Sequence, residues 1–348
     1  MFHELEERHA RTLKREAEFR KQYGYIRMPV TAVAGDKRMI AVGGSLLAQD
    51  GKDYGFVRTV HDVGLHFFGE EFLDQQSALP FEEQHVPIQW LSAWVDEHNL
   101  ANRVSPGDPA AQQLGSGAAW LRLAFDLYTI QDNSALQTAL RTRLLNPLQF
   151  QGARHELKIA ALWIAAGFTL TYEDERDRLK THPEFIAKDQ FSDLIVAVEA
   201  KSRHRTGVQG YAGGKPENLR RADVRKLLTE AYKKKVDLPL YVFVDLNLPR
   251  PENPSERDTW VSEIQATIAD MTTEGLHERG PVNAAFFTND PSHYLLRDRL
   301  VGDQDNLWVI SYRYEDPKVA HPSIDVIERI KLAFSHRVAP PSSYWDDE

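Results

Sequence analysis

Between residues 153 and 244 the hydrophobic pattern switches repeatedly between the period of a helix and the period of a strand, which narrows the possible folds. The first helix ends at Gly167, the residue type that most readily takes the left-handed conformation after a helix. The predicted segments are helix 153–166, strands 168–172, 184–187 and 194–200, helix 222–235 and strand 240–244. Their order, αβββαβ, implies a mixed central sheet flanked by helices, of the α/β or α+β class.

Turn-forming residues at 103–113 predict a boundary near residue 110. Before it we expect a mostly helical region of unknown role, with a possible pair of strands near residues 26–47. After it, a helix carrying Trp260, Ile264, Ile268 and Met271 at helical spacing precedes strands at 284–288 and 307–312. The predicted division is an N-terminal region 1–110 and a main domain 111–348, with its core at 150–245 and an extension at 246–348.

The absence of cysteine excludes disulfides, thiolate metal sites and cysteine nucleophiles, so a metal would need oxygen or imidazole ligands. The charged first twenty residues lack the apolar stretch of a secretory signal. The longest nearly apolar run, 157–168, is shorter than the roughly 20 residues that a membrane span needs. We therefore expect a cytoplasmic protein without a membrane partner.

Charge is distributed unevenly along the chain. The whole sequence carries a net charge of −9, which disfavours a protein that coats nucleic acid over its entire surface. Residues 198–235, in contrast, contain eleven Lys or Arg and four acidic residues. This basic segment indicates either a local phosphate-binding surface or an ordinary solvated helix face.

Glu199 and Lys201 are two apart on the most apolar predicted strand, so both side chains point to the same face, about 7 Å apart along the strand. A central strand has no solvent-exposed face, and two buried charges need a partner or a function. A structural ion pair is the simplest explanation. A site that binds a charged ligand is the alternative.

The preceding strand distinguishes these explanations. If residues 184–187 pair antiparallel with residues 197–199, Glu184 faces Glu199. Two adjacent carboxylates repel unless a cation lies between them, and a hard divalent ion with oxygen ligands meets that need. Asp193 is a competing acid, but about 20 Å of extended strand separates it from Glu199, too far to share an ion.

Pro183-Glu184 followed by Glu199-Ala200-Lys201 resembles the signature of the PD-(D/E)XK nuclease superfamily, and the αβββαβ order matches its restriction-endonuclease-like core. Glu156, on the helix before the first strand, resembles the acid that often completes the metal site of that family. The resemblance covers about residues 150–244. The first acid of the family is usually aspartate, so Glu184 is a departure.

The resemblance implies a metal-dependent nuclease in which Glu184, Glu199 and Glu156 bind Mg²⁺, or Mn²⁺ as a substitute, and Lys201 assists the attack on phosphate. It implies DNA rather than RNA as the substrate, and a role in restriction or defence. The basic residues expected to contact the nucleic-acid backbone are Arg203, His204, Arg205, Lys215, Arg220, Arg221 and Arg225. The alternatives are a binding or assembly module without catalysis and an RNA-directed phosphodiesterase of the same fold, and an oligomer is compatible with each.

Overall fold

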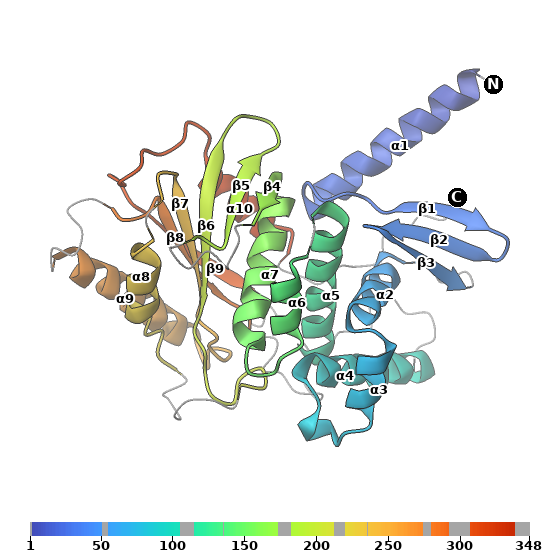
Figure 1. The fold of residues 1–348 in the computed structure, drawn as a ribbon, viewed down its shortest axis with the longest axis horizontal. Helices are drawn as coiled ribbons and strands as arrows, with labels where there is room; N and C mark the ends of the chain where they lie inside the picture. The colour runs from blue at the N-terminus through green and yellow to red at the C-terminus, as the bar shows by residue number, and fades with distance from the viewer. Residues whose placement is uncertain are drawn as a thin grey trace.

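Six strands form the central sheet, in the order β4-β5-β6-β7-β8-β9 (Figure 1). Strands β4, β5 and β6 form an antiparallel meander, β6, β7 and β8 are parallel, and β9 is antiparallel to β8. In this computed structural model the strands are Phe168–Thr171, Phe185–Asp189, Ile195–Ser202, Leu240–Asp245, Ala284–Asn289 and Trp308–Arg313. The structure describes residues 2–50, 55–104, 115–134, 136–172, 182–211, 220–234, 236–273, 280–291 and 307–337.

The helices that accompany the sheet lie on both of its faces (Figure 1). They are α7 (Phe150–Ala165), α8 (Arg225–Tyr232), α9 (Pro254–Thr273) and α10 (Val326–Ser335). Helices α8 and α9 connect the parallel strands β6, β7 and β8, as parallel neighbours require. The predicted order αβββαβ is therefore present as α7, β4, β5, β6, α8 and β7.

Strand β6 separates two hydrophobic cores because its side chains alternate between the faces. Val196, Val198 and Ala200 pack in the core that includes α7 and α10. Ala197 packs in the core formed with α8 and α9. The side chains of Glu199 and Lys201 follow the alternation of Ala197 and therefore point to the α8 face.

The predicted pairing of the second and third strands is confirmed. Phe185 lies opposite Val198 and Ile186 opposite Ala197, which is the predicted register. The backbone N–H of Glu184 donates to the carbonyl of Val198 at 2.9 Å, so the ladder continues to the residue before β5. Glu184 is thereby set beside the carboxyl half of β6.

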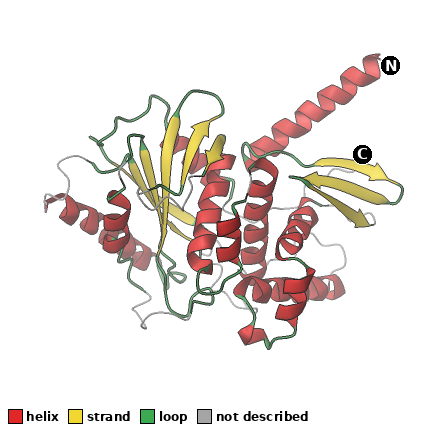
Figure 2. Cartoon of the chain, in the orientation of Figure 1, coloured by secondary structure: helices red, strands yellow, loops and turns green. Residues whose placement is uncertain are grey.

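The N-terminal part of the chain is helical except for a three-stranded antiparallel sheet, where the sequence predicted a pair of strands (Figure 2). Its strands are β1 (Val30–Ala34), β2 (Lys37–Val42) and β3 (Ser45–Asp50). Its helices are α1 (Phe2–Tyr23), α2 (Phe56–Phe68), α3 (Glu70–Ser77), the 3-10 helix η1 (Phe81–Glu83), α4 (Val86–Val104), α5 (Gly115–Asn133) and α6 (Thr138–Leu144).

Helix α5 joins this N-terminal part to the sheet, because every residue from Gly115 to Ile130 is buried. Its side chains share one hydrophobic core with α2, α4 and α7. The predicted boundary near residue 110 falls within 105–114, outside the described residues, and the core is continuous on either side of it. No helix in the described part of the chain is both long and apolar enough to cross a membrane.

Candidate functional site

Three of the predicted site residues meet at the carboxyl half of β6. The ammonium of Lys201 lies 2.5 Å from Oε1 of Glu199 and 3.9 Å from Oε1 of Glu184. A second ammonium, from Lys234 just after α8, lies 3.3 Å from the same Glu199 oxygen and also donates to the carbonyl of His182. The sequence placed Lys234 in the basic segment but gave no reason to assign it to the site.

Burial controls the electrostatics of this group of side chains. Glu199 is completely buried, and its Oε2 accepts no hydrogen bond from any described residue. Burial, and then the charges of Glu156 and Glu199, raise the pKa of Glu184 to about 8, against the opposing effect of the two lysines. Burial acts to lower the pKa of Lys201, but the neighbouring carboxylates, Glu199 above all, outweigh it and raise the pKa.

Glu156, on α7, acts on the same group through its charge. Both of its oxygens accept hydrogen bonds at 2.6 Å from Arg143 at the end of α6. Its charge raises the pKa of Glu184 and, after the larger effect of burial, that of Tyr172 at the end of β4. Arg143 was not predicted from the sequence, because no spacing rule links α6 to a glutamate 13 residues later.

The site balances three carboxylates with three cations, and the carboxylates are not equivalent as metal ligands. Among the residues that the structure describes, no three acids or histidines lie close enough to hold a metal ion by themselves. Glu156 is occupied by Arg143. Glu184 and Glu199 remain, and two carboxylates with water and phosphate oxygens suffice for magnesium. The buried Oε2 of Glu199 and the raised pKa of Glu184 fit a cation between them.

Asp193 lies far from this group. It is exposed in the turn between β5 and β6, beyond the opposite end of β6 from Glu199. The backbone N–H of Asp189 closes this turn by donating to the carbonyl of Leu194 at 2.9 Å. Asp193 therefore lies by the turn at the far end of β6 from Glu199, where the sequence predicted it.

The arginines that were expected to contact phosphate are engaged within the protein. Arg205 is completely buried, and its guanidinium donates to the carbonyls of Leu246 and Arg221 at 2.9 and 2.6 Å. Its role is to hold the loop after β6 in place, and a phosphate contact is not open to it in this structure. Arg203 pairs with Asp223 at 2.7 Å. Lys215 lies outside the described residues.

Acids of α9 and of the loop before it neutralise much of the remaining basic segment. Arg220 pairs with Glu252 at 2.7 Å and Glu256 at 2.5 Å, and Arg221 lies 3.7 Å from Glu263. Arg225 begins α8 and is half-buried, and the imidazole of His204 is exposed beside the ring of Tyr211. The expected basic stripe is therefore a set of ion pairs with a few exposed cations.

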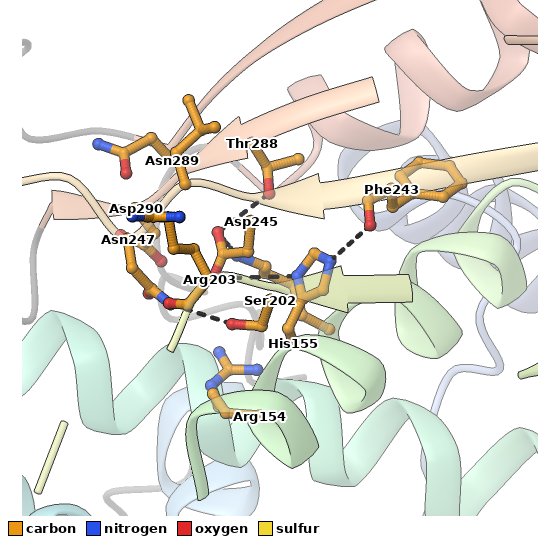
Figure 3. A network of polar contacts seen from close by, with 12 residues as sticks. Arg154, His155, Ser202, Arg203, Phe243, Asp245, Asn247, Thr288, Asn289 and Asp290 are labelled. Carbon is orange, nitrogen blue, oxygen red and sulfur yellow. Dashed lines mark hydrogen bonds and ion pairs between the residues drawn. The ribbon is translucent and has the colours of Figure 1, made fainter. Parts of the chain in front are cut away.

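A second polar network occupies the carboxyl ends of the parallel strands, on the α7 face (Figure 3). Asp245, the last residue of β7, accepts hydrogen bonds from Thr288 at 3.1 Å and from Lys158 at 3.3 Å. His155 lies between Asp245, 4.0 Å from Nδ1, and the carbonyl of Phe243, 3.2 Å from Nε2. Burial lowers the pKa of His155 to about 4, so its ring is neutral at physiological pH.

This network was not predicted from the sequence, because its members come from strand ends and helices far apart in the chain. Comparisons with protein families, with curated proteins and with solved structures found no match for this chain.

Proposed function

We propose that this chain is a metal-dependent phosphodiesterase that hydrolyses nucleic acid at Glu184, Glu199 and Lys201. The observation that carries the proposal is the pairing of β5 with β6. That pairing sets two carboxylates on neighbouring strands, with one ammonium 2.5 Å from the first and 3.9 Å from the second. The order of α7, β4, β5, β6, α8 and β7 supports the resemblance to the restriction-endonuclease-like core.

Glu184 and Glu199 would hold a magnesium or manganese ion, which supplies Lewis-acid polarisation of the phosphate when bound. Lys201 would place its ammonium against the phosphate oxygens, where negative charge grows in the transition state. Lys234 orients the buried carboxylate of Glu199, and Arg143 fixes Glu156 so that its charge acts on Glu184 and Lys201. Glu156 is thus a supporting residue in this proposal rather than a metal ligand.

The substrate class follows from the chemistry of Glu184, Glu199 and Lys201. These side chains fit a phosphodiester, but they offer no contact that would distinguish one base or sugar from another. DNA is the first substrate to test, because the resemblance implies it, together with a role in restriction or defence. Exposed cations of the basic segment include Arg221 and Lys226, whose side chains are 67% and 84% exposed. These can contact a phosphate backbone without disturbing the core.

A second candidate is a nucleic-acid-binding or assembly module of the same fold without catalysis. The observation in its favour is the charge balance of the site, in which Arg143, Lys201 and Lys234 already neutralise the three glutamates. In that case the buried charges have a structural role and take no part in catalysis. Calorimetric titration with manganese separates the candidates, since only the first requires binding that depends on Glu184.

The proposal predicts metal-dependent cleavage that single substitutions remove. Purified protein is incubated with supercoiled, linear and single-stranded DNA and with RNA, in magnesium or manganese. Lys201→Met and Glu184→Ala should lower the cleavage rate by at least about 100-fold, the usual scale for losing a group that stabilises transition-state charge. The protein with both site residues intact should cleave at least one of the four substrates.

Two matched substitutions serve as controls for the cleavage assay. Lys188→Met removes an exposed lysine from the neighbouring strand β5, and Asp193→Ala removes the acid of the turn. Both should keep the cleavage rate of the unmodified protein. Manganese binding without cleavage of any substrate would favour the second candidate. Loss of activity in Asp193→Ala but not in Glu184→Ala would reject this site.

A further inference from the structure

Two adjoining cavities lie at the carboxyl ends of β7 and β8, separate from the carboxylate site. Both are lined by Arg154, Lys158 and Asp290. Each has a volume of about 20 Å³, and one water molecule needs roughly 10–15 Å³ on this scale. Together they offer room for a small polyatomic ion.

The side chains around the cavities form a buried charge cluster, drawn from α5, α7, the residues after α10 and the ends of β7 and β8. Its cations are more than nine-tenths buried, at 6, 7, 8 and 6% exposure for Arg122, Arg154, Lys158 and Arg337. Its acids are Asp126, Asp245 and Asp290. The described members of the cluster therefore comprise four positive and three negative charges.

The ion pairs within the buried charge cluster leave one cation in excess at the cavities, and Arg122 is itself paired with Asp290 at 2.9 Å. Arg154 and Arg337 share one carboxylate, because both donate to Asp126. Lys158 makes one hydrogen bond among the described residues, to Asp245 at 3.3 Å, although an ammonium has three donors. Burying an uncompensated charge is costly, so an excess of buried cations at a cavity favours an anion there.

The position of the cluster in the fold agrees with this electrostatic argument. Asp245 ends β7 and Asp290 follows β8, so both stand at the carboxyl ends of parallel strands (Figure 3). In open α/β sheets that edge is the general location of ligand sites. Arg154 and Lys158 are one helical turn apart on α7 and point to the same cavities.

We propose that the buried charge cluster binds a small oxyanion, specifically a phosphoryl group, held by Arg122, Arg154 and Lys158. Arginine and lysine are the side chains that recognise phosphate oxygens, and low exposure strengthens each contact. The phosphoryl group belongs either to inorganic phosphate or to the terminal phosphate of a nucleotide whose remaining atoms extend toward solvent. This inference does not depend on the proposed phosphodiesterase activity.

The test is thermal melting of the full chain without divalent metal, in millimolar sodium phosphate against sodium chloride of equal ionic strength. A ligand that binds the folded state raises the melting temperature by mass action. We expect phosphate to raise it, and both Lys158→Met and Arg122→Gln to lose most of that increment. A nucleoside monophosphate at the same concentration identifies the source, since a larger increment indicates a nucleotide and an equal one indicates free phosphate.

Two control substitutions make the result specific to the cavities. Arg329→Gln removes a cation of another partly buried ion pair, with Asp189 at 2.8 Å, and should keep the full increment. Lys201→Met should also keep it. No increment over chloride in the unmodified protein overturns the proposal. An increment that Lys201→Met loses and both cavity variants keep also overturns it, because the anion would then lie at the carboxylate site.

Discussion

Lys201 and Lys234 approach the same oxygen of Glu199, and this shared contact changes what each lysine contributes. Glu199 has no exposure to water, so the two ammonium groups, and not solvent, compensate its buried carboxylate. Removing one lysine leaves the other in place. If both lysines are removed, the buried carboxylate of Glu199 has no compensating charge. That costs far more stability than the removal of one lysine.

We therefore predict non-additive effects on the free energy of unfolding. Lys201→Met and Lys234→Met should each cost about 1–2 kcal/mol, whereas the double variant should exceed the sum and reach the roughly 3–5 kcal/mol of a stranded buried charge. Urea denaturation of the four proteins measures the coupling, with Lys188→Met as a surface control. Additive losses would mean that the lysines do not share the compensation of Glu199.

Glu184 should make stability depend on pH in an unusual direction for a carboxylate. Its pKa is about 8 in the folded protein and near 4.5 ordinarily, so folding favours the protonated form. The stabilisation is complete below pH 4.5 and is lost as the pH rises through 8. One pKa unit corresponds to about 1.4 kcal/mol, so the loss amounts to a few kcal/mol.

Glu184→Gln, which imitates the protonated side chain, should consequently gain stability over the unmodified protein as the pH rises from 4.5 to 8, in the absence of divalent metal. Denaturation at several pH values measures this difference. Glu230→Gln on the surface of α8 corrects for general effects of pH. A difference that stays constant across the range would contradict the assigned environment of Glu184.

At the scale of elements, the spacing of hydrophobic residues along the chain predicted the strands of the central sheet well. The strands around Phe168, Phe185, Ile195 and Leu240 lie within one residue of their predicted starts. The carboxylate pair was also predictable, because antiparallel register fixes which residues face each other once two strands are known. The role of Arg143 was not predictable. Its contact with Glu156 depends on how α6 packs against α7, and the spacing of residues along the chain gives no information on that packing.

Helix α7 ends as its sequence predicted, and this end can be tested. Gly167 has a φ of +88°, and an added Cβ would lie 2.9 Å from the side chains of Arg329 and Phe191. Gly167→Ala should therefore lower the free energy of unfolding by at least the roughly 1–2 kcal/mol of a left-handed residue. Gly44→Ala is the matched control, because nothing lies within 4 Å of its added Cβ.

The Gly167 measurement is chemical denaturation of the two alanine variants and the parent. Gly44→Ala should be neutral or stabilise by about 0.4–1 kcal/mol, because it restricts only the unfolded chain. Equal stabilities for both variants would show that the turn after α7 relaxes without strain.

At the scale of the whole molecule, the sequence showed where the basic residues lie but not what they contact. The segment 198–235 looked like a phosphate-binding stripe in an acidic protein. In the structure Glu252, Glu256 and Glu263 lie against it and pair with Arg220 and Arg221. These acids are more than 30 residues away in the chain, so only the packing of α9 beside α8 reveals the neutralisation.

This pairing leads to a specific prediction for nucleic-acid binding by the whole molecule. Arg221 and Lys226 have side chains that are 67% and 84% exposed, and both lie at or beside α8, which packs on the Glu199 face of β6. Arg221→Gln and Lys226→Gln should weaken binding to all sequences alike. Each should reduce the slope of log affinity against log salt by about one unit.

Arg220→Gln and Lys14→Gln are the comparisons that make the salt measurement decisive. Arg220 is held by two glutamates, so its loss should lower stability and leave the salt slope nearly unchanged. Lys14 is 78% exposed on α1, remote in sequence from the site, and should change neither. Fluorescence anisotropy of a labelled duplex over a range of salt concentrations gives the slopes. If Lys14→Gln flattens the slope while Arg221→Gln and Lys226→Gln leave it unchanged, nucleic acid binds on the N-terminal part and the prediction for Arg221 and Lys226 is wrong.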